Sequence, residues 1–195
     1  MAYRATATRI DRDQALRERI LDQALARVIA GGFAALTMQA LADAVGIATG
    51  SLYRHFSNKG ELAAEVFARA SQREVDALAA TLSAPGSAPQ RLAAGVQQFA
   101  ARAWHSRRLA FALIAEPVDP EVDEQRLLYR EAYAELFTDL LEEGVRRGEF
   151  RLEQVGLVAA CLVGAIAEAL VGPLSPPARA ARDAGHFTLD LAEVS

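Results

Sequence analysis

Apolar residues recur every three or four positions along most of the chain, which is the spacing of amphipathic α-helices. The first such stripe follows i,i+4 steps at Leu16, Ile20, Ala24 and Val28. The pair Gly31–Gly32 comes next and should end that helix. Because the same spacing returns in the later segments, the pattern predicts an all-α chain.

Two short helical patterns follow each other in residues 37–56. Leu41 and Val45 form one i,i+4 apolar pair, and Leu52 and Phe56 form the next. Gly46 stands between the pairs, where a turn can use a backbone angle that glycine adopts easily. The pattern is typical of a helix-turn-helix, whose second helix can enter a DNA major groove. A plain helical hairpin with a polar outer face fits the spacing about equally well.

The rest of the chain predicts one long connecting helix and then a bundle. The connecting helix should run from a cap at Ser57 to about Leu82, before a loop of proline, glycine and serine at 83–89. Further helices are expected from about residue 90, over 107–115, over 120–148 after a cap at Asp119, over 152–171 before Pro173, and over 178–192. We therefore expect two domains, a head of residues 1–60 and a body of residues 61–195.

The first ten residues show little periodicity, so we expect a frayed terminus. Asp11 or Asp13 would then cap the first helix. The alternative is a basic arm that lies along DNA, because Arg4 and Arg9 fall in this segment.

Charge is distributed unevenly along the chain. The net charge of −4 argues against a protein that binds nucleic acid with its whole surface. The head carries eight Arg/Lys and five Asp/Glu, a net +3, and the body carries thirteen and twenty, a net −7. A positive head on a negative body would direct the head toward DNA.

Cysteine and histidine usage excludes several kinds of site. Cys161 is the single cysteine, so no intramolecular disulfide can form, and its apolar helical setting predicts a buried, inert thiol. The three histidines at 55, 105 and 186 are too dispersed for a local metal motif, and we expect no metal and no cofactor. Without a signal peptide, or an apolar run of about 20 residues free of a charge or helix breaker, we expect a cytoplasmic protein with no membrane partner.

One block of the helix-turn-helix pattern is more specific than its spacing. It reads Gly-Ser-Leu-Tyr-Arg-His-Phe at 50–56, with Lys59 three residues later. Its flanks contribute Ile20–Leu25, Gly32–Phe33, Thr37, Leu41–Ala42, Val45–Ile47 and Leu62. With these residues, the stretch from about 17 to 67 resembles the DNA-binding domain of the TetR family of bacterial repressors. The resemblance implies a regulator that binds double-stranded operator DNA, with repression as the family norm.

The resemblance also implies the residues that contact DNA. They are Thr37, Gln39, Thr49, Gly50, Ser51, Tyr53, Arg54, His55 and Lys59. Thr37 would cap the second helix, and the amide of Gln39 suits an adenine edge. Ala48 departs from the family, which usually has a capping serine there, so Thr49 is expected to take over as cap.

Two of these positions have a physical rationale of their own. Glycine in a helix costs about 1 kcal/mol relative to alanine, and close approach of DNA to the backbone would explain Gly50. Lys59 falls in the first turn of the connecting helix, where backbone N–H groups and the ammonium could hold one phosphate together.

Small residues in the body predict a close helix contact. Gly156, Ala160 and Gly164 follow a four-residue step, and Ala167 lies beside them. Such spacing lets another helix approach closely. We therefore expect a homodimer formed through the two C-terminal helices.

The family resemblance implies that the body holds a small-molecule effector in a cavity among its helices. The aromatic residues expected to line a mostly apolar pocket are Phe67, Phe99, Trp104, Phe111, Tyr133 and Phe137. Core packing is the alternative for each of them. The acidic cluster at 116–124 is expected to serve as a helix start rather than as a catalytic group.

These observations favour an all-α, two-domain transcriptional regulator and not an enzyme. We expect a repressor that a small, mostly apolar effector releases from its operator. The alternative is a helical small-molecule-binding protein or enzyme that has kept a vestigial helix-turn-helix. A gel shift with the DNA upstream of its own gene distinguishes the two.

Overall fold

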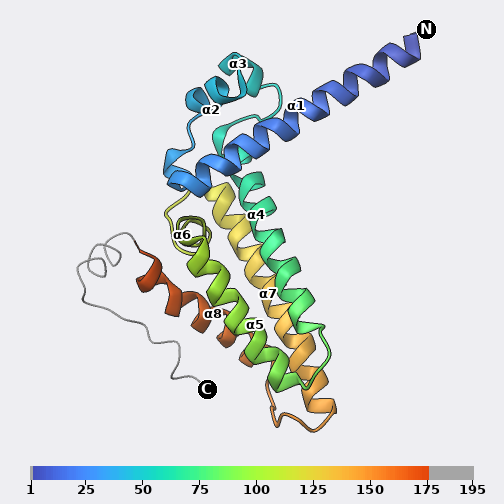
Figure 1. Cartoon of the computed structure of the whole chain (residues 1–195), viewed down its shortest axis with the longest axis vertical. Coiled ribbons are helices and arrows are strands. Elements are labelled where there is room, and N and C mark those ends of the chain that lie inside the picture. The colour runs from blue at the N-terminus through green and yellow to red at the C-terminus, as the bar shows by residue number, and fades with distance from the viewer. Residues whose placement is uncertain (1, 176–195) are drawn as a thin grey trace.

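Helices joined by short loops make up the whole described fold. The computed structural model describes residues 2–175, in which there are eight α-helices, one 3-10 helix and no strand (Figure 1). In chain order they are α1 (Ala2–Gly31), η1 (Phe33–Ala35), α2 (Met38–Val45), α3 (Thr49–Leu52), α4 (Lys59–Leu82), α5 (Ala88–His105), α6 (Arg107–Ile114), α7 (Pro120–Arg146) and α8 (Val155–Leu174). The all-α prediction is confirmed. The last predicted helix, over 178–192, lies outside the described residues.

Helix α1 begins much earlier than the sequence pattern predicts. The predicted frayed terminus, with a cap at Asp11 or Asp13, is wrong, because both aspartates lie inside a helix that starts at Ala2. Residues 2–10 contain three alanines and no glycine or proline, so nothing interrupts the helix. In Figure 1 the N-terminal half of α1 extends beyond the rest of the molecule.

The turn between α2 and α3 forms as predicted, but two of the predicted helix caps, Thr49 and Ser57, are wrong. Thr37 caps α2 by accepting a hydrogen bond from the Ala40 N–H at 3.3 Å, and Gly46 ends it in the left-handed region with φ 77°. Thr49 does not cap α3; it is the first helical residue, after an extended Ala48. Asn58, not Ser57, caps α4, since its side chain accepts the Glu61 N–H at 2.8 Å.

The hydrophobic core of the head continues into the body. One cluster of buried side chains joins α1, η1, α2 and α3 to α4, and it includes Ala112 of α6 and Val122 of α7. Phe33 is buried and stacks on Phe67 of α4, with ring centroids 6.3 Å apart. The connecting helix α4 therefore packs against both the head and the body.

A second core lies at the far end of the body, between α4, α5, α7 and α8. Close approach there depends on Gly144 of α7, where an added Cβ would collide with Phe150 and Ala88. Beside it the buried guanidinium of Arg91 lies 2.6 Å from Glu143 and donates to the Leu82 carbonyl at 2.9 Å. These contacts join the ends of α4, α5 and α7.

Helix α8 differs from its prediction at both ends and in one side chain. It runs three residues past 171 and contains Pro173 in its last turn. Cys161, predicted to be buried, is exposed. The reason is that α8 turns an apolar face outward; Leu157, for example, is 63% exposed.

The outward face of α8 is unusually apolar for a surface. By length and composition α8 could cross a membrane. Its most apolar 18-residue stretch has a mean hydropathy of 2.2, and only 6% of that stretch is buried inside the protein. A single helix of this kind is weak evidence for membrane insertion. A large exposed apolar patch also marks protein interfaces.

Candidate functional site

The outer surface of α2 and α3 carries a small hydrogen-bonded network. The Thr49 hydroxyl donates to Gln39 Oε1 at 2.9 Å, and Gln39 Nε2 donates to Asp43 Oδ1 at 3.0 Å. Gln39 is exposed on this surface. The network fixes the orientation of its amide between the two helices, which lowers the entropy cost of any contact that the amide makes.

Four predicted contact residues follow on α3 and the turn after it. Tyr53 is 51% exposed, and Arg54 donates to Ser51 Oγ at 3.2 Å. Gly50 is exposed in the first turn of α3, and a Cβ added there would meet no atom of the described residues within 4 Å. Nothing within the described part of the chain therefore requires glycine at this position.

His55 is placed differently from its neighbours. Its side chain is 5% exposed, and Nε2 lies 3.8 Å from Asp13 of α1. The imidazole thus lies against α1 rather than on the outer surface. The spacing within residues 37–56 does not predict this contact, because Asp13 lies in a different helix, far away in the sequence.

Lys59 and Thr37 each lie at the start of a helix. Lys59 is the first residue of α4, and its Nζ lies 3.5 Å from Asp119 at the start of α7. Both side chains of this pair are about two-fifths exposed, so the ammonium remains open to solvent and to further partners. Thr37 is exposed, and its hydroxyl is used as the cap of α2.

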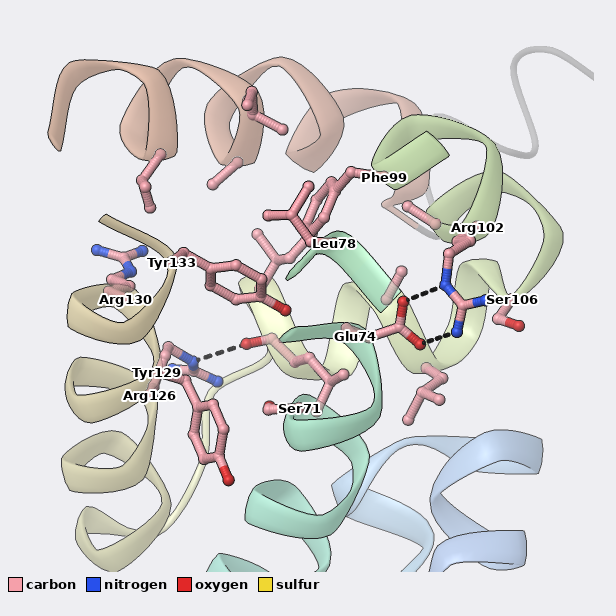
Figure 2. A pocket seen from close by; sticks show the side chains of 18 of the residues that line it. Ser71, Glu74, Leu78, Phe99, Arg102, Ser106, Arg126, Tyr129, Arg130 and Tyr133 are labelled. Atoms are coloured by element: carbon pink, nitrogen blue, oxygen red, sulfur yellow. Dashed lines mark hydrogen bonds and ion pairs between the residues drawn. The ribbon is translucent and has the colours of Figure 1, made fainter. Parts of the chain in front are cut away.

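Inside the body, a cavity of about 90 Å³ lies between α4, α5, α6, α7 and α8 (Figure 2). Four of the six predicted aromatic residues line it: Phe67, Phe99, Tyr133 and Phe137. Phe99 and Tyr133 meet edge to face, with centroids 5.6 Å apart. The walls are mostly apolar, as expected of a site for an apolar small molecule.

The other two predicted aromatic residues lie elsewhere. Trp104 is 37% exposed, and the guanidinium of Arg107 covers its ring at 3.7 Å. Phe111 packs near Leu170 and Leu174, in a small cluster at the end of α8. Helical spacing alone does not separate these two positions from the residues that face the cavity.

The cavity also has polar walls that the aromatic pattern does not reveal. Arg102 forms a bidentate ion pair with Glu74, with N···O distances of 2.6 and 2.8 Å (Figure 2). Burial raises the pKa of the Tyr133 hydroxyl far above its ordinary value, so it stays protonated. Ser71, Ser106, Arg126, Tyr129 and Arg130 complete the polar part of the lining.

Arg126 connects the cavity to the end of α6. It donates to the carbonyls of Leu113 at 3.0 Å and Glu116 at 2.9 Å, and it pairs with Asp123 at 2.5 Å. Burial lowers the pKa of Arg126 from its ordinary value, yet it remains a cation. Arg126 thereby satisfies carbonyl groups that the C-terminus of α6 leaves free.

The loop after α6 attaches directly to the head. The Glu116 carboxylate accepts hydrogen bonds from the N–H groups of Phe33 at 2.9 Å and Ala34 at 3.1 Å. Glu121 lies so close to Gly60 that a Cβ there would collide with its carboxylate. Two members of the acidic cluster therefore fasten the body to the head, and no group of three potential metal ligands occurs in residues 2–175.

The predicted dimer residues divide between two faces of α8. Gly156, Ala160 and Gly164 are exposed on the outer face, whereas Ala167 lines the cavity with Val163 and Ile166. A Cβ added at Gly156 or Gly164 would meet no described atom within 4 Å. The outer stripe is thus free of contacts within the described protomer.

Comparison with known proteins gives two family matches. Residues 20–66 match the family described as bacterial regulatory proteins, tetR family, and residues 85–170 match the tetracyclin repressor-like C-terminal domain. Between them, the two matches include most of the head and most of the described body.

Among curated proteins, the chain is similar to HTH-type transcriptional repressors named KstR. It is 39% identical over 77 residues to that of Mycobacterium tuberculosis (strain ATCC 25618 / H37Rv), covering 39% of this chain and 34% of the relative. It is 42% identical over 57 residues to that of Rhodococcus jostii (strain RHA1), covering 29% and 27%. The match thus spans about a third of these relatives or less.

Solved structures share the fold over most of the chain. The regulator FadR from Bacillus subtilis, solved in complex with stearoyl-CoA, has a TM-score of 0.67 and 20% identity, covering 79% of this chain and 84% of that chain. Reduced NemR from E. coli has a TM-score of 0.69 and 19% identity, covering 86% and 89%. At these identities the likeness concerns the fold alone.

Proposed function

Because this chain belongs to the TetR family of bacterial regulatory proteins, we propose that it binds double-stranded operator DNA and represses transcription in the cytoplasm. The head, residues 1–60, would bind DNA, and the body, residues 61–195, would bind the effector and form the dimer. The observation that carries the proposal is the hairpin of α2 and α3, with its left-handed turn at Gly46 and its polar outer surface.

Roles in DNA binding follow from where the side chains lie. The oriented amide of Gln39 is suited to a base edge. Tyr53, Arg54 and Lys59 are suited to phosphates, which position the protein without reading sequence. His55, which lies against α1, would instead hold α3 in place.

A homodimer would bring two such heads to one operator. The proposed interface is the outer face of α8, with Gly156, Ala160 and Gly164 in contact with a second copy, together with residues after 175. Burial of this apolar face would provide the driving force for association. Two heads must then match half-sites roughly 34–36 Å apart.

The effector mechanism rests on the size and position of the cavity. A volume of about 90 Å³ is below the roughly 300–1,000 Å³ of sites for drug-sized ligands. A larger apolar molecule would therefore have to move α6 or α7 outward. Since Arg126 binds the end of α6 and Glu116 binds the head, such a movement would change the angle of the head and release DNA.

Lys59→Ala tests the phosphate contact. We expect affinity to fall similarly for all DNA sequences, with the salt dependence flatter by about one unit of slope, because one phosphate contact is lost. Gln39→Ala is the matched contrast: it should relax preference at particular base pairs by about 1–3 kcal/mol. Gel shifts across a salt series measure both. Unchanged operator affinity in the folded double variant would contradict the proposed contacts and favour a vestigial helix-turn-helix.

Glu116→Ala tests the connection between cavity and head. Ligands are first found by a change in the fluorescence of Trp104, which follows cavity-lining Ala103 in α5. In the wild type, such a ligand should release operator DNA over the same concentration range. The variant should bind the ligand with similar affinity and release DNA less completely, because coupling falls by about 0.5–2 kcal/mol. Full release by the variant would exclude this route.

A further inference from the structure

Three arginines line the cavity, and two of them already have partners. Arg102 is paired with Glu74 through its Nε and Nη2 atoms. Arg126 is paired with Asp123 and donates to backbone carbonyls at the end of α6. The charge of each of these two cations is thus offset by a carboxylate of the same chain.

The third arginine, Arg130, has no ion pair or hydrogen bond with any described residue, and it is exposed. It lies one turn after Arg126 on α7. Burial lowers the pKa of Arg126 most, and repulsion by the charge of Arg130 lowers it further. Like charges at i,i+4 are mutually destabilising on a helix. An anion beside Arg130 would relieve this repulsion.

Arg130 also stands where the apolar cavity opens. A second, more open groove shares Ile114, Arg126 and Arg130 with the cavity and continues over Ala115, Asp123 and Leu127. The Asp123 carboxylate in this groove is paired with Arg126, so its charge is offset. A ligand that fills the apolar cavity can therefore extend past Arg130 into solvent. Inside, the Tyr133 hydroxyl points into the cavity and adds one hydrogen-bonding group to the apolar walls (Figure 2).

We propose that the effector is an anionic amphiphile, whose apolar part occupies the cavity and whose acidic group binds Arg130 at the mouth. This inference rests on the proposed function only in taking the cavity as the effector site. A neutral apolar ligand would leave Arg130 unpaired, whereas a carboxylate or phosphate forms strong charge-assisted hydrogen bonds with a guanidinium.

The experiment compares ligands that differ in the head group alone. Straight-chain carboxylates and the alcohols of equal chain length are titrated into the full-length protein by calorimetry, below their micelle concentrations. At the chain length that binds best, the carboxylate should bind at least about tenfold more tightly than the alcohol. Arg130→Gln should remove this difference by weakening the carboxylate alone, and Arg130→Lys should restore part of it.

Arg108→Gln is the matched control, because Arg108 is an exposed arginine of α6 that does not line the cavity. It changes net charge equally and should leave both affinities within about twofold. No carboxylate binding, equal binding of acid and alcohol, or an equal loss in Arg130→Gln and Arg108→Gln would overturn the proposal. These titrations contain no DNA, so a failed gel shift would refute the regulatory function and leave this result unaffected.

Discussion

Gly164→Leu should convert the protein from a dimer to a monomer and lower operator affinity by roughly a hundredfold or more, because two linked heads bind far more tightly than one. Gly164 lies in the exposed small-residue stripe of α8, and a Cβ added there would meet no described atom of its own protomer within 4 Å. The substitution should therefore leave the fold intact and act only where a second copy approaches. Light scattering and a gel shift on the same preparation measure both effects.

The control for this variant is Ala80→Leu, a similar enlargement at an exposed position of α4. It should remain dimeric and bind the operator normally. If Gly164→Leu elutes as a folded dimer with full operator affinity, the interface lies elsewhere and the outer face of α8 needs another partner.

Gly50→Ala should stabilise the protein and weaken its binding to DNA at the same time. Alanine favours a helix over glycine by up to about 1 kcal/mol, and a methyl group at Gly50 would meet no described atom. If a phosphate approaches the backbone at this position, the same methyl group would push it away. We expect a small rise in the midpoint of thermal unfolding and a loss of operator affinity of about tenfold or more.

Gly172→Ala provides the comparison, since a methyl group there also meets no described atom within 4 Å, in a helix that is not part of the head. Its operator affinity should stay at the wild-type level, provided that the variant remains dimeric. Undiminished DNA binding by Gly50→Ala would mean that DNA does not approach this part of α3 closely.

Local signals in the sequence were sufficient to predict the apolar pairs and the turn of the helix-turn-helix. The apolar pairs Leu41–Val45 and Leu52–Phe56 are buried as their spacing predicts, and Gly46 adopts the left-handed turn. Thr37 caps its helix as its type and position predict. Such features depend on interactions within about four residues, which a single sequence displays directly.

Features that depend on distant segments were harder to predict. Asn58 and Ser57 are both good capping residues, and only the packed loop decides between them. Apolar spacing identifies Trp104 and Phe111 as facing inward, but the position of α8 decides which aromatic residues reach the cavity. Glu116 is acidic, like its neighbours, and its contact with Phe33 spans 83 residues.

The cavity arginines follow the same rule. Arg102, Arg126 and Arg130 look alike in sequence, and they differ only in the partners that the fold brings to them. The exposure of Cys161 has a related cause. An apolar helix is buried in a protomer only if another helix covers every face, and part of α8 is left uncovered.

The shared core of head and body limits how the head of one such protein can be joined to the body of another. Transplanting residues 1–60 onto another body would cut the core between Phe33 and Phe67 and would separate the head from Ala112 and Val122. A functional chimera therefore needs a junction beyond Ala70, with compatible side chains at 112 and 122 and an acidic residue at 116. By the same reasoning, the head cannot be exchanged alone: its specificity for DNA has to be transferred together with the N-terminal half of α4.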